Sequence, residues 1–278
     1  MGRVTTRRPV VRVRDGIASR RPDTLAVEEP LEIRLGRSPL TITMRTPGDD
    51  IDLAHGFLVS EGIIKSENDI RGARYCAGAT EDGVNTYNVL EIDLDPDVDV
   101  PDLALARNFY STSSCGVCGK ASLDALRTTA AWSIADDPAR VTTEQLAAFP
   151  DQMRAAQQVF DKTGGLHAAA LFTAEGDLVA LREDVGRHNA VDKIVGSALR
   201  AGHLPLRNHV LMVSGRTSFE LAQKALMAGI PILAGVSAPS SLAVDLAHEF
   251  GLTLVGFLRG TSMNIYAGHE RVTGINVT

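Results

Sequence analysis

The sequence contains few cysteines, few aromatic residues and no long apolar run. Its three cysteines, Cys76, Cys115 and Cys118, form an odd set in 278 residues, which excludes the disulfide framework of a small secreted domain. No window approaches the roughly 18 uninterrupted apolar residues of a transmembrane helix, and the N-terminus lacks the apolar stretch of a secretory signal. We therefore expect a cytoplasmic protein without membrane contact.

Net positive charge is also absent, because 28 lysines and arginines face 34 aspartates and glutamates, giving a formal net charge of −6. This balance argues against nucleic acid as a partner. Arginines nevertheless crowd the first 21 residues, and aspartates gather near residue 100; both groups could be ordinary solvated surface. They are Arg3, Arg7, Arg8, Arg12, Arg14, Arg20 and Arg21, and Asp93, Asp95, Asp97, Asp99 and Asp102.

The first hundred residues alternate apolar and polar side chains, which predicts strands. The predicted strands are residues 10–14, 25–35, 40–45, 71–76 and 85–94. One helix is predicted over residues 51–61, with Asp49 or Asp50 as its N-cap and Gly62 as its C-cap.

The prolines at positions 96 and 101 break regular structure and mark a boundary between lobes. We expect an arginine-rich N-terminal arm (1–24), a β-rich N-terminal lobe (25–107) and an α/β lobe (108–278). In the last lobe we predict helices over 120–131, 142–163 and 190–201, and a hairpin joining strands 168–172 and 178–181.

The last third alternates strands 209–213, 230–236 and 253–258 with helices 219–228 and 242–250. This βαβαβ order implies a parallel sheet covered by helices, whose binding site lies in the loops after the strands. Those loops are 214–218, 237–241 and 259–262, and their backbone N–H groups, with Arg216 or Arg259, are candidates to receive phosphates.

The segment most suggestive of chemistry is Cys115-Gly-Val-Cys118, followed by Lys120 at the start of a predicted helix. A helix N-terminus and a nearby ammonium stabilise a thiolate, which is the form that attacks sulfane sulfur. The pattern alone leaves rivals open. A zinc site needs about four ligands, and neither Cys76 nor any histidine has a recognisable ligand spacing; a thioredoxin-like redox pair and a purely structural pair also remain.

Two further segments are rich in polar groups. Residues 182–193 place eight polar groups at a strand-to-helix corner. They either form a functional site, or Asn189 caps the helix and its neighbours form surface ion pairs. Residues 45–62 include Asp49, Asp50 and His55, for which helix capping and packing are the ordinary explanations.

Together these segments resemble the FdhD family of formate dehydrogenase accessory sulfurtransferases. The resemblance rests on RTPGDDIDLAHGFLVSEGII, NFYSTSSCGVCGKASLDAL, TGGLHAAALF, REDVGRHNAVDKIVG, VSGRTSFELAQKA, GIPILAGVSAPSSLAVDLA and GFLRGTSMNIY, which cover most of the chain from about residue 45 onward. It implies an α/β fold of mixed or parallel sheet with flanking helices, similar to cytidine deaminases, beside the β-rich N-terminal lobe.

The resemblance also implies a sulfur relay. A cysteine desulfurase passes sulfane sulfur to Cys115, with Cys118 as the partner thiol, and the persulfide is delivered to the molybdenum of a bis-molybdopterin guanine dinucleotide cofactor destined for formate dehydrogenase. The family's cofactor-binding segment falls on Phe257, Leu258, Arg259, Gly260, Thr261 and Ser262. A homodimer is implied as well. The resemblance does not imply the zinc site of the deaminases, because Ser114 stands where their motif has proline and Phe57 stands where it has glutamate.

Two alternatives belong to other classes. A cofactor chaperone or docking adaptor for formate dehydrogenase would move no sulfur, and a dithiol oxidoreductase would cycle a Cys115–Cys118 disulfide.

Overall fold

The computed structural model describes residues 4–76, 87–100, 123, 126, 127 and 129–275. Its strands are β1 Thr5–Arg14, β2 Ile17–Ala26, β3 Glu29–Leu35, β4 Ser38–Arg45, β5 Ile70–Tyr75, β6 Val89–Leu94, β7 Val141–Thr142, β8 His167–Thr173, β9 Leu178–Asp184, β10 His209–Val213, β11 Ile232–Gly235, β12 Thr253–Arg259, β13 Ser262–Ala267 and β14 Val272–Thr273. Its helices are α1 Asp50–Ser60, α3 Thr143–Ala156, α4 Gln158–Thr163, α5 Arg187–Arg200, α6 Phe219–Met227 and α7 Ser241–Phe250, with 3-10 turns η1 Glu67–Asp69 and η3 His269–Arg271.

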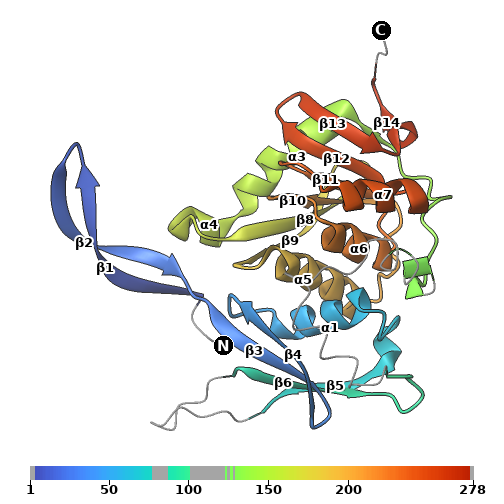
Figure 1. Ribbon diagram of the computed structural model, residues 1–278, viewed down its shortest axis with the longest axis horizontal. Helices are drawn as coiled ribbons and strands as arrows, with labels where there is room; N and C mark the ends of the chain where they lie inside the picture. The colour runs from blue at the N-terminus through green and yellow to red at the C-terminus, as the bar shows by residue number, and fades with distance from the viewer. Residues whose placement is uncertain (1–3, 77–86, 101–122, 124–125, 128, 276–278) are drawn as a thin grey trace.

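A six-stranded sheet of order β13-β12-β11-β10-β8-β9 forms the centre of the molecule (Figure 1). Strands β10, β11 and β12 are parallel, whereas β8, β9 and β13 run antiparallel to their neighbours, so the sheet is mixed. Helix α3 packs on one face through Leu146, Phe149 and Met153. Helices α5, α6 and α7 cover the other face, so that every parallel strand is buried on both sides.

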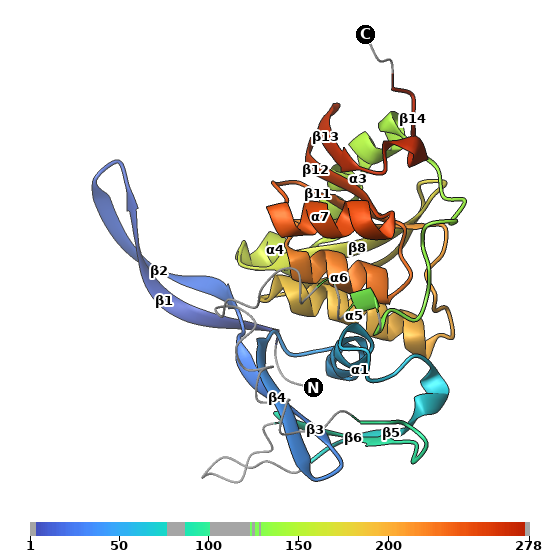
Figure 2. The same cartoon turned by 45° about the vertical axis from the view of Figure 1, so that its right-hand side comes forward.

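A second sheet of order β4-β3-β6-β5 lies below this layer, and helix α1 lies between the two (Figures 1 and 2). One hydrophobic core includes Leu31 and Ile92 of the small sheet, Leu58 of α1, Val195 of α5 and Leu233 of the large sheet. The β-rich and α/β lobes therefore share a continuous core. The division at residues 24 and 107 stays a prediction.

Strands β1 and β2 form a hairpin that projects away from both sheets (Figures 1 and 2). Its two-residue turn is Asp15-Gly16, with φ of 49° and 79°, the left-handed pair that suits the twist of a tight hairpin. The predicted single strand over residues 25–35 is wrong. The chain leaves the β1–β2 ladder after Ala26 and joins a different sheet at Glu29.

The sequence prediction is confirmed for the β8–β9 hairpin and the β10–α6–β11–α7–β12 order, within two residues at nearly every end. Helix α5 begins three residues earlier than predicted, and residues 142–163 form two helices that break at Gln157. Strand β13, which pairs with β12, was not predicted. The likeness to cytidine deaminases stays a prediction.

Among the described residues, none of the helices is long and apolar enough to cross a membrane.

Candidate functional site

The loops after β10, β11 and β12 meet at the carboxyl edge of the large sheet. The Thr217 N–H donates to the Ala238 carbonyl (3.3 Å), and the Ser240 N–H donates to the Thr217 carbonyl (3.0 Å). The Phe257 N–H donates to the Ser237 carbonyl (3.1 Å). The three loops, which the sequence predicted only to lie at the same edge of the sheet, are therefore in direct contact through backbone hydrogen bonds.

The predicted cofactor-binding segment, Phe257 to Ser262, is not an open loop. Phe257, Leu258 and Arg259 belong to β12, Ser262 begins β13, and only Gly260 and Thr261 form the turn between them. Leu258 is fully buried, whereas Phe257 is 39% exposed with a positive φ of 51°, a strained conformation for a bulky residue. The irregular backbone turns Phe257 outward, and the Arg259 guanidinium donates to the Val236 carbonyl (3.3 Å).

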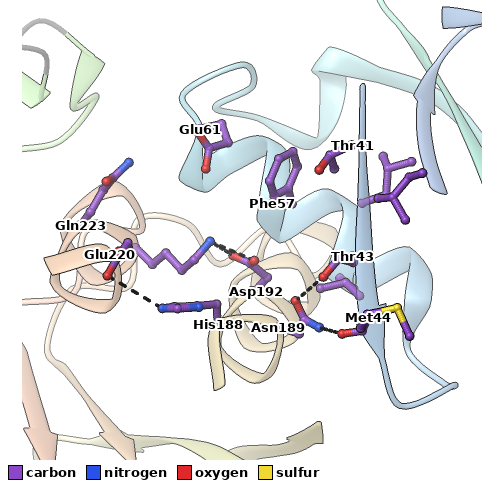
Figure 3. Close-up of a pocket in the computed structure, with 14 residues that line it drawn as sticks. Thr41, Thr43, Met44, Phe57, Glu61, His188, Asn189, Asp192, Glu220 and Gln223 are labelled. Atoms are coloured by element: carbon purple, nitrogen blue, oxygen red, sulfur yellow. Dashed lines mark hydrogen bonds and ion pairs between the residues drawn. The ribbon is translucent and has the colours of Figure 1, made fainter. Parts of the chain in front are cut away.

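A cavity of 320 Å³ lies behind this edge, between the small sheet and helices α1, α5 and α6 (Figure 3). Apolar side chains of β3, β4 and α1 form one wall, and polar side chains of α5 and α6 form the other. Its lining is Ile33, Thr41, Ile42, Thr43, Met44, Leu53, Phe57, Glu61, His188, Asn189, Asp192, Glu220, Gln223 and Lys224.

A buried ion pair crosses this cavity from α6 to α5. The Lys224 ammonium contacts both Asp192 carboxylate oxygens, at 2.8 and 2.9 Å, and the Ser60 hydroxyl donates to the same carboxylate at 2.8 Å. The side chains of Lys224 and Asp192 are only 8% and 3% exposed. Lys224 Nζ also lies 5.9 Å from the centre of the Phe57 ring, so one ammonium ties three helices together.

Glu61 and His188 are two of the cavity's titratable groups whose pKa values are shifted. Burial raises the pKa of Glu61, against the opposing effect of the Lys224 ammonium. Burial, with the positive charges of Lys224 and Arg187, lowers the pKa of His188 to about 4. His188 is therefore a neutral imidazole at neutral pH, with Nε2 3.4 Å from the Ser218 hydroxyl. This contact joins the cavity to the loop after β10.

The low pKa of His188 predicts a specific pH dependence of stability. Its pKa is 6.5 when unperturbed and about 4 in the fold, so the unfolded chain binds more protons between these values. The stabilisation from neutral His188 is complete above pH 6.5 and is lost as the pH falls toward 4. His188→Gln should lose less unfolding free energy than the wild type over this interval, measured by urea denaturation. An equal loss in both proteins would show that His188 does not titrate in this way.

Several polar groups in residues 182–193 form contacts between the large and the small sheet. The fully buried Asp184 carboxylate lies 2.7 Å from the Lys193 ammonium and accepts hydrogen bonds from Thr46 N–H (3.1 Å) and Asn189 Nδ2 (3.0 Å). Asn189 also donates to the Met44 carbonyl at 2.8 Å. The alternative that Asn189 caps helix α5 is wrong, because α5 begins at Arg187, two residues before Asn189, and the Asn189 amide contacts β4 instead.

The 45–62 segment is braced by arginines. Arg45, 1% exposed, donates to both Asp50 oxygens at 3.0 Å, and Arg200 contacts Asp52 at 2.6 Å. Asp49 is the N-cap of α1, as predicted, although its side chain makes no cap hydrogen bond. His55 is buried and its Nδ1 lies 2.7 Å from the Ile51 carbonyl, as the packing explanation requires.

Of the three cysteines, the structure describes only Cys76. Cys76 donates to Glu91 Oε2 at 3.3 Å, and this hydrogen bond together with burial raises the pKa of its thiol. Cys115 and Cys118, like Lys120, lie outside the described residues. Within the described ranges, no group of three or more His, Cys, Asp or Glu side chains is placed to hold a metal ion.

Sequence reasoning assigned no role to Ser60, which bonds to Asp192, or to several residues that line the cavity: Glu61, Glu220, Gln223 and Lys224. A signal was nevertheless available on α6, where Glu220 and Lys224 are four residues apart on a helix that is otherwise largely apolar. Charged groups on one face of a buried helix indicate partners on other elements.

The fold and its site define a class: a mixed α/β protein whose candidate ligand site combines sheet-end loops with a cavity beneath a second sheet. The model of the FdhD/NarQ family matches residues 26–273, and the chain belongs to this family. Matching relatives include proteins named sulfur carrier protein FdhD from Streptomyces coelicolor (69% identical, covering 98% of this chain and 97% of the relative) and Saccharolobus solfataricus (44%, covering 98% and 100%).

A crystal structure from Desulfotalea psychrophila, of a protein assigned as a formate dehydrogenase accessory protein, has the same fold. It matches with a TM-score of 0.74 at 26% identity and covers 97% of this chain and all of that one. The fold is therefore shared by distant members.

Proposed function

We propose that this chain is a sulfur carrier for the maturation of formate dehydrogenase. The Cys115 thiolate attacks the sulfane sulfur of a cysteine desulfurase persulfide, the desulfurase thiolate leaves, and the new persulfide is held on Cys115 with Cys118 as the assisting thiol. The terminal sulfur then passes to the molybdenum of the bis-molybdopterin guanine dinucleotide, which is substrate here rather than a resident group. The Cys115 thiolate leaves, and the molybdenum gives up the two electrons that convert sulfane sulfur to a sulfido ligand.

The proposal rests on the different environments of the three cysteines. Of three cysteines, Cys76 is engaged by Glu91 and its pKa is raised, so it is a poor source of thiolate. The closely spaced pair Cys115 and Cys118, set among glycines, remains for the chemistry. The names of the relatives support sulfur carriage by this family.

The contact between the loops after β10, β11 and β12 supports this edge of the sheet as the place where the cofactor binds. Arg259 lies at the turn between β12 and β13, next to Val236, where a guanidinium can contact a phosphate. The proposal places the guanine dinucleotide phosphates against Phe257 to Ser262, with Arg216 as a second contact. The cytidine-deaminase-like fold and cytoplasmic location belong to the same proposal.

The test is sulfur loading from a cysteine desulfurase supplied with ³⁵S-labelled cysteine, scored as reductant-sensitive label on the protein. The wild type and Cys76→Ala should take up equal label, and Cys115→Ala should fall to background. Cys118→Ala shows whether the second thiol is needed. Arg259→Ala should load normally but bind the cofactor about tenfold or more weakly, because a charge-assisted hydrogen bond is lost.

Three results would contradict the proposal. A wild type that takes up no label from an active desulfurase would favour the cofactor chaperone or adaptor. Label that persists on Cys115→Ala but is lost from Cys76→Ala would place the nucleophile elsewhere. A Cys115–Cys118 disulfide that cycles with a reductant, without label transfer, would favour the dithiol oxidoreductase.

A further inference from the structure

A second cavity, of 480 Å³, lies at the carboxyl edge of the large sheet, on the face that α3 covers. Helices α3 and α4 bound it on one side, so it is called the α3–α4 cavity here. On the other side it is bounded by His167 at the start of β8, Ser214 after β10 and Val236 after β11. No residue that lines it belongs to the segment 257–262, which the family resemblance implies for cofactor binding.

Gln157 lines this cavity with a buried side chain that has no partner. It stands at the break between α3 and α4 and is only 3% exposed. Its side chain makes no cap hydrogen bond, and no described residue hydrogen-bonds to its amide. Because a buried amide without a hydrogen bond is unfavourable, the position calls for a hydrogen-bonding group inside the cavity.

The fold holds Gln157 firmly in this position. The backbone N–H groups of Val159 and Phe160 donate to the two Glu183 carboxylate oxygens, at 2.8 and 2.7 Å. This carboxylate binds the first turn of α4 to strand β9 and so fixes the backbone beside Gln157. An amide that is fixed before a ligand arrives loses little conformational freedom on binding.

The remaining side chains of the cavity suit an uncharged aromatic ring. Met153 and Phe160 supply apolar surface, and the Phe160 ring carries the Arg154 guanidinium 4.8 Å from its centre. Burial, together with the positive charge of Arg187, lowers the pKa of His167, so its imidazole is neutral at neutral pH. Apolar walls with a few well-placed polar groups are typical of sites for small organic ligands.

The cavity adjoins the place that the proposed function gives to the cofactor phosphates. Val236 lines the cavity, and its carbonyl accepts a hydrogen bond from the Arg259 guanidinium at 3.3 Å. A ring in the cavity and phosphates at Arg259 therefore occupy adjacent sites, as the parts of one dinucleotide require.

We infer that Gln157 recognises the ring edge that guanine and pterin share, an oxo group beside a ring N–H and an amino group. The inference rests on the proposed function, because these are the two kinds of ring in the molybdopterin guanine dinucleotide. A carboxamide matches this edge with two parallel hydrogen bonds. Gln157 Nε2 donates to the oxo group, and Oε1 accepts from the ring N–H. The α3–α4 junction thus contributes a specificity-determining residue that lies apart from the sheet-end loops.

The test is the binding of two separate probes, GDP and neopterin, to the full chain by isothermal titration calorimetry. At least one probe should bind the wild type. Gln157→Leu should bind that probe about tenfold or more weakly, because both hydrogen bonds are lost while the size of the side chain is nearly kept. The probe whose affinity falls identifies the ring in the cavity, guanine for GDP and pterin for neopterin.

The matched control is Gln158→Leu, the same change at the neighbouring exposed position, which should bind the probes as the wild type does. Urea denaturation separates recognition from structure. Because Gln157→Leu removes a buried amide that has no partner, it should unfold at an equal or higher urea concentration than the wild type.

Three outcomes would overturn the inference. They are a wild type that binds neither probe, a Gln157→Leu protein that binds as tightly as Gln158→Leu, and a Gln157→Leu protein that loses binding and stability together. Sulfur loading of the wild type is measured independently. Its absence would contradict the proposed function without altering the titrations, so the two failures are distinguishable.

Discussion

Replacing Lys224 by methionine is expected to lower the free energy of unfolding by about 3–5 kcal/mol, because it leaves a buried carboxylate without its partner. Asp192 is 3% exposed, and Lys224 contacts both of its oxygens. The Ser60 hydroxyl remains as a donor but carries no charge. Urea denaturation of the wild type and Lys224→Met measures the difference.

Two comparisons isolate the cause of this loss. Asp192→Leu/Lys224→Met removes both charges and should recover most of the stability, since an apolar replacement of a buried ion pair is often neutral. Arg71→Met breaks the exposed pair with Asp95, whose side chains are 59% and 31% exposed, and should cost less than about 1 kcal/mol. A Lys224→Met loss as small as that of Arg71→Met would show that the pair does not hold the helices together.

Alanine at Gly56 is expected to destabilise the protein by about 3 kcal/mol or more, although alanine is the better helix former by about 1 kcal/mol. Helices α1 and α5 cross with their backbones in contact. A Cβ on Gly56 would overlap the Asp192 carbonyl, and a Cβ on Gly196 would overlap the Asp52 carbonyl. Because the obstacle is backbone, relief requires the helices to separate.

The control for this prediction is Gly72→Ala, where an added Cβ meets no atom within 4 Å and φ is not positive. It should change the unfolding free energy by less than about 0.5 kcal/mol. Separation of α1 from α5 would also move Phe57 and Ser60 away from Lys224 and Asp192. A stabilised Gly56→Ala would mean that the crossing tolerates a side chain.

Local patterns in the sequence determined most of the secondary structure. Strands β10 to β12 and helices α6 and α7 follow from apolar spacing at periods of two and about 3.6 residues, which depends only on near neighbours. The Asp15-Gly16 turn was also readable as a hairpin signal, and the N-terminal arm was not predicted to be a hairpin because that signal was not used.

The loops at the carboxyl edge of the sheet followed from the sequence because strand order and direction dictate which ends meet. The residues that complete the site did not. Ser60 and Asp192 are 132 positions apart, and Thr43 and Asn189 are 146 apart. No local pattern encodes such pairs, so capping by Asn189 stayed open as an alternative and Lys224 was given no role.

The sequence by itself therefore determined the family, the thiol pair at Cys115 and Cys118, and the alternating helices and strands of its last third. Only the tertiary structure decided that a second sheet and α1 close a cavity over α5 and α6, that the Lys224–Asp192 pair crosses it, and that residues 5–26 form a projecting hairpin. The physical reason is that periodicity is set by neighbouring residues, whereas cavities, buried ion pairs and exposed faces arise from packing between distant segments.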